Sequence, residues 1–379
     1  MSNCKQLIKK IISYIPLPTR RIILLESYPD CTGNTKAVFD ELIRRGCNSK
    51  YKMIWMLQTS NPENHEKIYN VKYLKRGLSL YLSFCFAKLF ICENSFFSKT
   101  HKHGQYIMYL THGAPLKNDT WYYKVPDDVD EMVDLSPFFQ KYDILSLNDR
   151  NRSIVLNPLG FPRNDVLLGE RRNPHELFKD RNFNRLIYWL PTFRQHKNVG
   201  LEHSSVSIPI IHDEENALAI NQKALESNVL IAVKPHPVQD LSKIKALNLS
   251  NILFIENDYL IEKGFTNYEL LGCSDALLTD YSSVYYDFLM TNRPIGLCWE
   301  DFEDYNSREG FVVDINQVMA GGEKLYSVED LCGFIDRIGS GIDLLQERRA
   351  DVRRMVFPNG IHFSTSQTAD RIEEILNNL

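Results

Sequence analysis

The stretch ALLTDYSSVYYD, residues 276–287, shows the fold class of this chain most clearly. Its first four residues form an apolar run that is typical of a short buried strand. A polar turn with two serines follows, and apolar residues then return at helical spacing, which predicts a helix that starts close to Ser283. A strand that runs through a polar turn into a helix is the unit from which helix-covered parallel sheets are built.

The same unit recurs along the chain, with a polar segment at 172–184 that resembles a linker. We expect strands at 22–25, 52–57, 89–92, 106–110, 185–190, 229–233, 252–254, 276–279 and 295–297, and helices at 35–45, 78–88, 329–338, 344–354 and 368–379. The simplest α/β architecture is two Rossmann-like domains, 21–172 and 185–355, that face each other across a cleft. A helix at 356–379 is expected to pack back across the domains. Ligands of such sheets bind at the carboxyl ends of the strands.

Composition places the chain among folded globular proteins and narrows the classes of function. The 379 residues are 44% hydrophobic and 24% charged, with a net charge of -4, which disfavours a nucleic-acid partner. The eight cysteines form no C-x-x-C pair, so a zinc or redox site has no support. We expect neither a spanning helix nor a signal peptide, and therefore a cytoplasmic protein.

Residues 1–20 are basic, although the chain as a whole has a negative net charge. The first 21 residues carry five basic residues and no acidic one. Apolar residues at helical spacing predict a basic amphipathic helix that ends at Pro16 and Pro18. Such a helix is typical of contact with an anionic membrane surface, and equally of a first helix packed on its domain with solvated lysines. The residues alone leave both interpretations open.

The segment THGAPLK, residues 111–117, continues directly from an expected strand. A histidine titrates near neutral pH, so His112 is a candidate base for a hydroxyl group. Gly113 permits close approach of the backbone to a ligand, and Lys117 adds a positive charge. A loop histidine without a role is the alternative.

Two further turns each present an arginine. Arg163 lies in GFPRND, residues 160–165, and Arg194 lies in LPTFR, residues 190–194. A guanidinium group suits phosphate because its donors form a planar fork. Taken singly, each arginine is also explained by a surface ion pair or a helix cap.

The segment KPHP, residues 234–237, holds Lys234 and His236 at the end of an expected strand between two prolines. Rigid presentation of both groups suits phosphoryl transfer, where positioning and electrostatics supply most of the catalysis. A structural histidine fixed by prolines is the alternative.

The polar turn at residues 280–283 supplies a last group of candidates. Ser282 and Ser283 would lie at a helix N-terminus, where N–H groups attract phosphate. Thr279 and Asp280 precede them. An ordinary helix cap would explain one serine but not the whole cluster.

Dinucleotide, Walker A, zinc-protease and serine-hydrolase motifs do not occur in the sequence. Asp128-Val129-Asp130 is a conceivable metal–diphosphate site, but its acidic surroundings, residues 127–134, favour a solvated loop. We therefore expect no metal and no cofactor.

These segments, in this order, resemble the CDP-glycerol glycerophosphotransferase family of teichoic-acid and capsule synthesis. The resemblance runs from about residue 22 to 315 and also includes Ser274 to Ser283 and Asn292-Arg293-Pro294. It implies a GT-B fold, a donor nucleotide bound mainly by the second domain and no obligatory metal. The family's two important histidines correspond to His112 and His236, and its phosphate-binding hydroxyls to Ser282 and Ser283.

The function expected from this resemblance is transfer of a polyol phosphate, glycerol phosphate above all, from a CDP-polyol to a hydroxyl of a lipid-linked or polymeric cell-envelope acceptor. CMP would leave, and the enzyme would work at the inner face of the cell membrane. His112 and His236 are the expected catalytic residues. The expected substrate-binding residues are Gly113, Lys117, Arg163, Arg194, Lys234, Thr279, Asp280, Ser282 and Ser283.

Two rival functions remain. A GT-B glycosyltransferase that uses a sugar nucleotide often carries two glutamates eight positions apart, whereas Glu262 and Glu269 are seven apart. A non-catalytic nucleotide-binding scaffold of the envelope machinery would keep the fold without needing the histidines.

Overall fold

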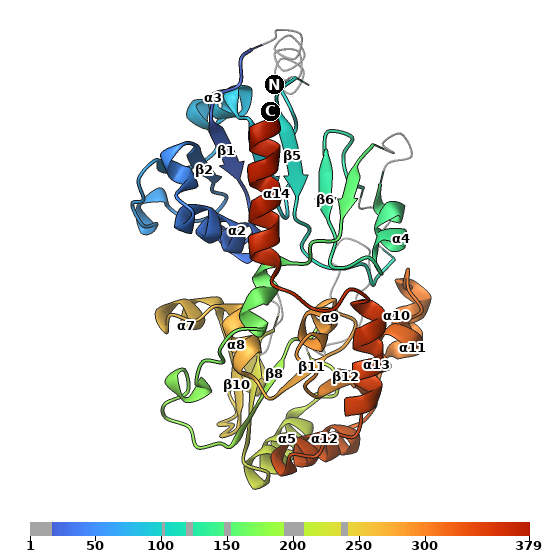
Figure 1. The fold of residues 1–379 in the computed structure, drawn as a ribbon. Coiled ribbons are helices and arrows are strands. Elements are labelled where there is room, and N and C mark those ends of the chain that lie inside the picture. The colour runs from blue at the N-terminus through green and yellow to red at the C-terminus, as the bar shows by residue number, and fades with distance from the viewer. Residues whose placement is uncertain (1–16, 101–102, 119–123, 148–152, 193–207, 236–241) are drawn as a thin grey trace. The chain divides into compact units, whose positions relative to one another are not determined.

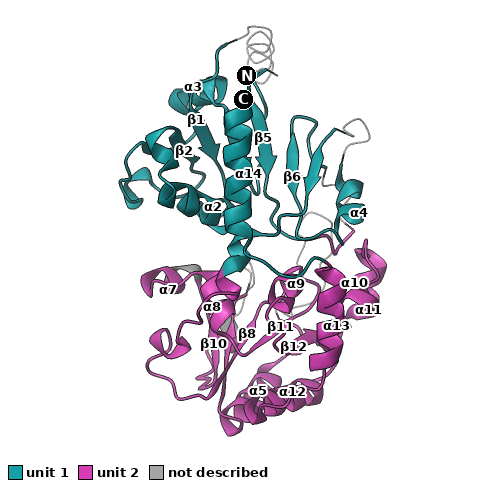
Figure 2. Cartoon of the chain, in the orientation of Figure 1, with its two compact units in different colours: residues 1–114, 120–165, 359–379 teal, residues 115–119, 166–358 magenta. Residues whose placement is uncertain are grey.

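The computed structural model describes residues 17–100, 103–118, 124–147, 153–192, 208–235 and 242–379. These residues divide into two compact units, shown in Figure 2. Unit 1 holds the described residues up to Ala114, those within 120–165, and 359–379, whereas unit 2 holds those within 115–119 and 166–358. Most of the expected N-terminal helix, residues 1–16, lies outside the described residues. No helix in the described part of the chain has the length and hydrophobicity needed to cross a lipid bilayer.

Unit 1 is built on a parallel sheet with the strand order β3-β2-β1-β4-β5-β6-β7. Its strands are β1 Ile22–Leu25, β2 Lys52–Met56, β3 Val71–Leu74, β4 Leu89–Cys92, β5 Tyr106–Tyr109, β6 Glu131–Val133 and β7 Val155–Asn157. Its helices are α2 Gly33–Arg44, α3 Leu78–Phe86, α4 Gln140–Asp143 and α14 Ser364–Asn378. The reversal of strand order between β1 and β4 is the switch point at which ligands of such sheets bind.

Unit 2 repeats this topology with the parallel order β10-β9-β8-β11-β12-β13. Its strands are β8 Arg185–Trp189, β9 Val229–Val233, β10 Ile252–Phe254, β11 Ala276–Thr279, β12 Ile295–Cys298 and β13 Glu323–Leu325. Its helices are α5 Glu214–Glu226, α6 Ser242–Lys245, α7 Asn257–Glu262, α8 Asn267–Cys273, α9 Val284–Leu289, α10 Phe302–Arg308, α11 Ile315–Val318, α12 Val328–Ser340 and α13 Gln346–Val356. The prediction of two Rossmann-like parallel sheets is therefore confirmed.

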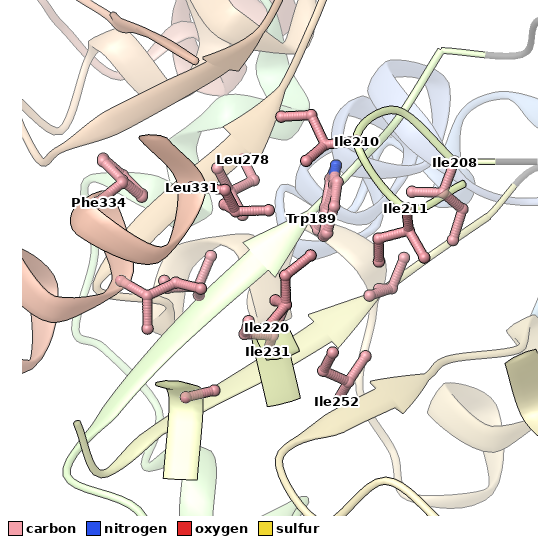
Figure 3. Packing of buried hydrophobic residues seen from close by; sticks show 14 of the residues in the cluster. Trp189, Ile208, Ile210, Ile211, Ile220, Ile231, Ile252, Leu278, Leu331 and Phe334 are labelled. Atoms are coloured by element: carbon pink, nitrogen blue, oxygen red, sulfur yellow. The ribbon is translucent and has the colours of Figure 1, made fainter. Parts of the chain in front are cut away.

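Each sheet is covered because its helices present apolar residues at helical spacing. In α12, Leu331, Phe334, Ile335 and Ile338 recur on one face and are buried against the sheet of unit 2. Figure 3 shows how Leu331 and Phe334 join Trp189, Ile231 and Leu278 in this core. Ser327 caps the start of α12 by accepting from the Asp330 N–H group, and Gly341 ends it in the left-handed conformation.

The C-terminal helix α14 belongs to unit 1, where it lies along the sheet beside α2 (Figure 1). Asp165 caps its start by accepting from the N–H groups of Ser364 at 2.7 Å and Thr365 at 2.8 Å. Arg371 then donates to the fully buried carboxylate of Glu131, with its Nη2 2.8 Å from Oε2. The GFPRND segment thus anchors a helix that starts about 200 residues later in the chain.

The structure corrects several expectations. The first stretch of unit 1 ends at Asp165 rather than at residue 172, and residues 359–379 return to this unit. The expected linker at 172–184 is part of unit 2, where Leu177, Phe178 and Phe183 are buried. The acidic stretch 127–134 contains the buried strand β6, where Arg371 neutralises Glu131. Asp130 of the Asp-x-Asp motif binds the Lys99 ammonium at 2.6 Å and the Ile107 N–H group at 2.8 Å, which explains it without a metal.

Candidate active site

The ligand edge of unit 1 is filled by two of its own carboxylates. Glu26 follows β1 and is fully buried, and its Oε2 accepts from the N–H groups of Glu93, Asn94 and Ser95 at 3.2, 3.1 and 3.0 Å. Its Oε1 accepts from the Gln58 side chain at 2.9 Å. Glu26 therefore occupies, inside the protein, a ring of backbone donors that would suit a phosphate.

Glu93 follows β4 and lies against the first turn of α2. Its carboxylate accepts from the Thr35 N–H group at 3.1 Å, and its Oε1 lies 3.4 Å from Nη1 of Arg163. Burial raises the pKa of Glu93 to about 7, although the Arg163 charge and the amides of Thr35 and Asn34 act in the opposite direction. The position at which a Rossmann domain binds phosphate is here taken by a side chain of the protein.

His112 lies in the turn that follows β5, close to this carboxylate. Its carbonyl oxygen accepts from Nη1 of Arg163 at 2.8 Å, and its Nδ1 lies 3.4 Å from the Tyr109 hydroxyl. Part of the His112 side chain is exposed, and Gly113 beside it is half-buried. Desolvation by the surrounding protein lowers the pKa of His112, and the Arg163 charge lowers it further. A neutral imidazole with an exposed face can accept a proton at neutral pH.

Arg163 was expected to bind phosphate, but its described contacts are with the protein. Its guanidinium joins the His112 carbonyl to Glu93, and the Arg163 side chain is only 10% exposed. The structure thus brings His112, Gly113 and Arg163 together in unit 1. Contact of Arg163 with a substrate phosphate stays a prediction.

In unit 2, Thr279 and Asp280 hold the turn after β8. The Thr279 hydroxyl donates to the Leu190 carbonyl at 2.8 Å. The Asp280 carboxylate accepts from the Thr192 N–H group at 2.9 Å and also from the Thr192 hydroxyl. Both side chains are fully buried. These contacts fix the segment that leads towards Arg194, while direct ligand binding by either residue stays a prediction.

Ser282 and Ser283 lie where the sequence placed them, at the start of α9. Both are half-buried, and the Ser282 hydroxyl accepts from the Val284 N–H group at 3.4 Å, which is a long hydrogen bond. Ser283 is the residue before the helix and makes no side-chain cap. An ordinary cap therefore does not account for this pair of hydroxyls.

Lys234 follows β9 on the same sheet and is half-buried. Its Nζ donates to Oδ1 of Asn267 at 3.3 Å, an atom that also accepts from the Tyr188 hydroxyl. Burial lowers the pKa of Lys234 to about 8. Lys234 is therefore still mostly protonated at neutral pH, although its buried environment disfavours the charge.

Lys117 belongs to unit 2, although the sequence joins it to His112. Residues 116–118 run antiparallel to 310–312, with the Val312 N–H group donating to the Leu116 carbonyl at 3.0 Å. The Lys117 ammonium lies 5.6 Å from the ring centre of Tyr305, which stacks on Tyr281 next to Asp280. The THGAPLK segment is therefore divided between the units after Ala114.

Two predicted site residues, Arg194 and His236, lie outside the described residues, so their roles stay predictions. No group of three or more His, Cys, Asp or Glu side chains in the described part of the chain is arranged to hold a metal ion. Two residues near His112 were not predicted from the sequence: Asn34, which contacts the Thr111 carbonyl, and Glu93, which pairs with Arg163. Glu93 could have been predicted, because it is a polar residue directly after a buried strand, the same signal that indicated His112.

Two Rossmann-like parallel sheets with polar groups at the carboxyl ends of their strands define a fold of the GT-B type. Comparison with known protein families shows which family this is. The model of the family described as "CDP-Glycerol:Poly(glycerophosphate) glycerophosphotransferase" matches residues 9–376, and the chain belongs to this family. It is accordingly an enzyme of the glycerophosphotransferase kind.

Individual relatives are more distant. The chain is 24% identical to a teichoic acid poly(glycerol phosphate) polymerase of Bacillus spizizenii, over 82% of each chain. It is also 24% identical to a teichoic acid glycerol-phosphate transferase of Staphylococcus aureus, over 97% of this chain and 98% of that one. The solved structure of the wall teichoic acid polymerase TagF shares the fold, with a TM-score of 0.75 at 19% identity, over 100% of this chain and 97% of that one.

Proposed function

We propose that this enzyme transfers glycerol phosphate from CDP-glycerol to a hydroxyl group of a lipid-linked or polymeric cell-envelope acceptor, with release of CMP. The observation that carries the proposal is the contrast between the two ligand edges. In unit 1, Glu26 and Glu93 fill the positions that suit phosphate. In unit 2, the Lys234 ammonium and the Ser282 and Ser283 hydroxyls follow β9 and β11.

The contrast supports a division of labour. A diphosphate would be repelled by the carboxylates of unit 1, whereas the ammonium and hydroxyls of unit 2 can stabilise it. Donor binding is therefore assigned to unit 2, together with His236 and Arg194. The acceptor hydroxyl is assigned to His112, whose lowered pKa keeps the imidazole neutral and able to take a proton.

In the reaction, the proton of the acceptor hydroxyl passes to the His112 imidazole as the oxygen attacks the phosphorus that bears the glycerol. A new P–O bond forms, the P–O bond to CMP breaks, and CMP leaves with the bonding electrons. General-base assistance of this kind contributes roughly 10²–10⁴-fold to the rate, and loss of one charge-stabilising donor costs about 3 kcal/mol.

The structure gives Glu269, whose spacing from Glu262 already differs from the glycosyltransferase pair, a structural role. It accepts from the Thr266 N–H group at 2.6 Å in a capping box at the start of α8. Its carboxylate also binds Arg172 at 3.2 Å. Both interactions explain Glu269 as a structural residue of unit 2.

The test of the function is the chemistry of the product. The enzyme is incubated with a short lipid-linked acceptor and either a panel of CDP-polyols or a panel of UDP-sugars, and products are identified by mass spectrometry. We expect glycerol phosphate to be added and CMP to be released in equal amount. Addition of a hexose with release of UDP would refute the proposal.

We further propose that the enzyme is cytoplasmic and peripheral on the inner face of the cell membrane, where a lipid-linked acceptor would lie. The surface of α3 supports this contact, since Leu78 and Leu82 on it are 75% and 48% exposed. No acidic residue occurs between residues 67 and 92, whereas Lys75 and Arg76 are exposed just before the start of α3. Exposed leucines flanked by cations suit an anionic lipid surface.

The membrane contact is tested with vesicles that contain anionic lipid. Burial of the two leucines contributes about 2 kcal/mol, so Leu78→Glu with Leu82→Glu should weaken binding by roughly 30-fold. The matched control is Leu218→Glu with Leu225→Glu on α5, where the leucines are 51% and 48% exposed beside acidic residues. Equal loss in both double variants, or in neither, would contradict a contact through α3.

A further inference from the structure

The first turn of α2 is hydrogen-bonded to the turn that contains His112 through the buried side-chain amide of Asn34. Asn34 is fully buried, and its Nδ2 donates to the carbonyl oxygens of Thr111 at 2.9 Å and Leu110 at 3.3 Å. Its Oδ1 accepts from the backbone N–H group of Arg163 at 3.1 Å. Both ends of a single side chain therefore link the segment before His112 to the segment that carries Arg163.

These hydrogen bonds matter because the backbone at Thr111 has an unfavourable conformation. Thr111, directly before His112, has a φ of +52°, in the left-handed region that a β-branched residue seldom adopts. Such a conformation persists only where the surroundings fix it. The Thr111 hydroxyl donates to the Val133 carbonyl at 3.1 Å. Asn34 holds the Thr111 carbonyl and Arg163 holds the His112 carbonyl, so the carbonyls on both sides of the His112 Cα atom are fixed.

Glu93 anchors the other side of the same arrangement. Its carboxylate binds the start of α2 through the Thr35 N–H group and pairs with Arg163, whose Nη1 also donates to the His112 carbonyl. Gly33 leaves the space that Glu93 fills, because a Cβ atom at this glycine would lie 2.4 Å from the Glu93 Oε1. The position of Arg163 is thus set from both Asn34 and Glu93.

We propose that Asn34 and Glu93 are positioning residues for the transfer reaction, which fix the Thr111–Gly113 turn and so hold the His112 imidazole in its reactive place. The inference rests on the proposed function, because it takes His112 as the base for the acceptor hydroxyl. Neither residue is assigned contact with a substrate.

The consequence for catalysis follows from the sensitivity of proton transfer to geometry. A displacement of about 1 Å at a reacting group can cost 10²-fold in rate. Loss of the Asn34 amide frees the backbone on the N-terminal side of His112, so kcat should fall by about tenfold or more. The KM for CDP-glycerol should change by less than about twofold, because the donor is bound by unit 2.

The experiment compares Asn34→Ala with Asn251→Ala in the full-length enzyme. Asn251 is a matched control in unit 2, since it is buried and its Nδ2 donates to the Val229 carbonyl at 2.9 Å. Steady-state kcat and KM are measured with CDP-glycerol, and amide hydrogen exchange is followed over residues 111–114. We expect slower turnover and faster exchange in Asn34→Ala, and neither change in Asn251→Ala.

Glu93→Gln keeps the shape of Glu93 and provides a second variant should Asn34→Ala fold poorly, with the same expected changes. Wild-type exchange over residues 111–114 and a wild-type kcat in the folded variants would overturn the proposal, and so would an equal loss of kcat in Asn251→Ala. Absence of CMP release by the wild type with every CDP-polyol would refute the proposed function instead, and the exchange measurement would still decide whether Asn34 and Glu93 hold the turn.

Discussion

Replacement of Lys234 by arginine should remove the alkaline limb of the pH–rate profile. Burial lowers the pKa of Lys234 to about 8, so this lysine loses its charge as the pH rises through about 8. About nine tenths of the side chains are charged at pH 7 and about one tenth at pH 9. If the ammonium binds the donor diphosphate, kcat/KM for CDP-glycerol should fall by close to tenfold between these pH values. Arginine keeps its charge throughout this range.

The assay is CMP release at low CDP-glycerol concentration, because kcat/KM reports the ionisation of the free enzyme. Lys245→Arg is the control, since Lys245 is an exposed lysine of the same unit that pairs with Glu256 at 2.7 Å. Its profile should match that of the wild type. An alkaline limb near pH 8 that persists unchanged in Lys234→Arg, or that is absent from the wild type, would refute the assignment of Lys234 to the donor.

The acid limb and the stability of each unit give further predictions. Because the pKa of His112 is lowered, kcat/KM should fall only as the pH drops below about 6.5, and a limb well above that value would argue against a neutral imidazole base. Arg371→Met leaves the Glu131 carboxylate buried without its ion pair, which should cost about 3–5 kcal/mol in denaturant unfolding, and a loss below about 1 kcal/mol would contradict the docking role of α14. Asp280→Asn replaces one of the two oxygens that accept from Thr192 by an amide nitrogen, so it should raise the KM for CDP-glycerol if the Thr192 turn serves donor binding; substrate titration measures this, and an unchanged KM would contradict that role.

Much of the fold could be predicted from local sequence patterns. Buried parallel strands such as β9 and β11 are short apolar runs, and their bounds agree with those expected. β6 was not predicted, because an acidic residue such as Glu131 is typical of a solvated loop. Its burial depends on Arg371, which lies 240 residues away and neutralises it. Burial made possible by a distant partner leaves no local signal.

The candidate site follows the same rule. His112, Lys234 and the serines of α9 were found because each follows or closely follows an apolar strand. The contacts of Asn34 were not found, because its partner Arg163 lies 129 residues away. Lys117 was grouped with His112 because the two are neighbours in sequence, yet the chain leaves unit 1 after Ala114, between them.

The most direct test of His112 as the base separates donor binding from transfer in one variant. For His112→Ala, the Kd for CDP-glycerol is measured by calorimetry, and CMP release is measured with the acceptor at saturating donor. We expect a Kd within about twofold of the wild type and a loss of at least about 10²-fold in the rate of transfer. A His112→Ala enzyme that turns over like the wild type, or one that no longer binds the donor, would contradict this role of His112.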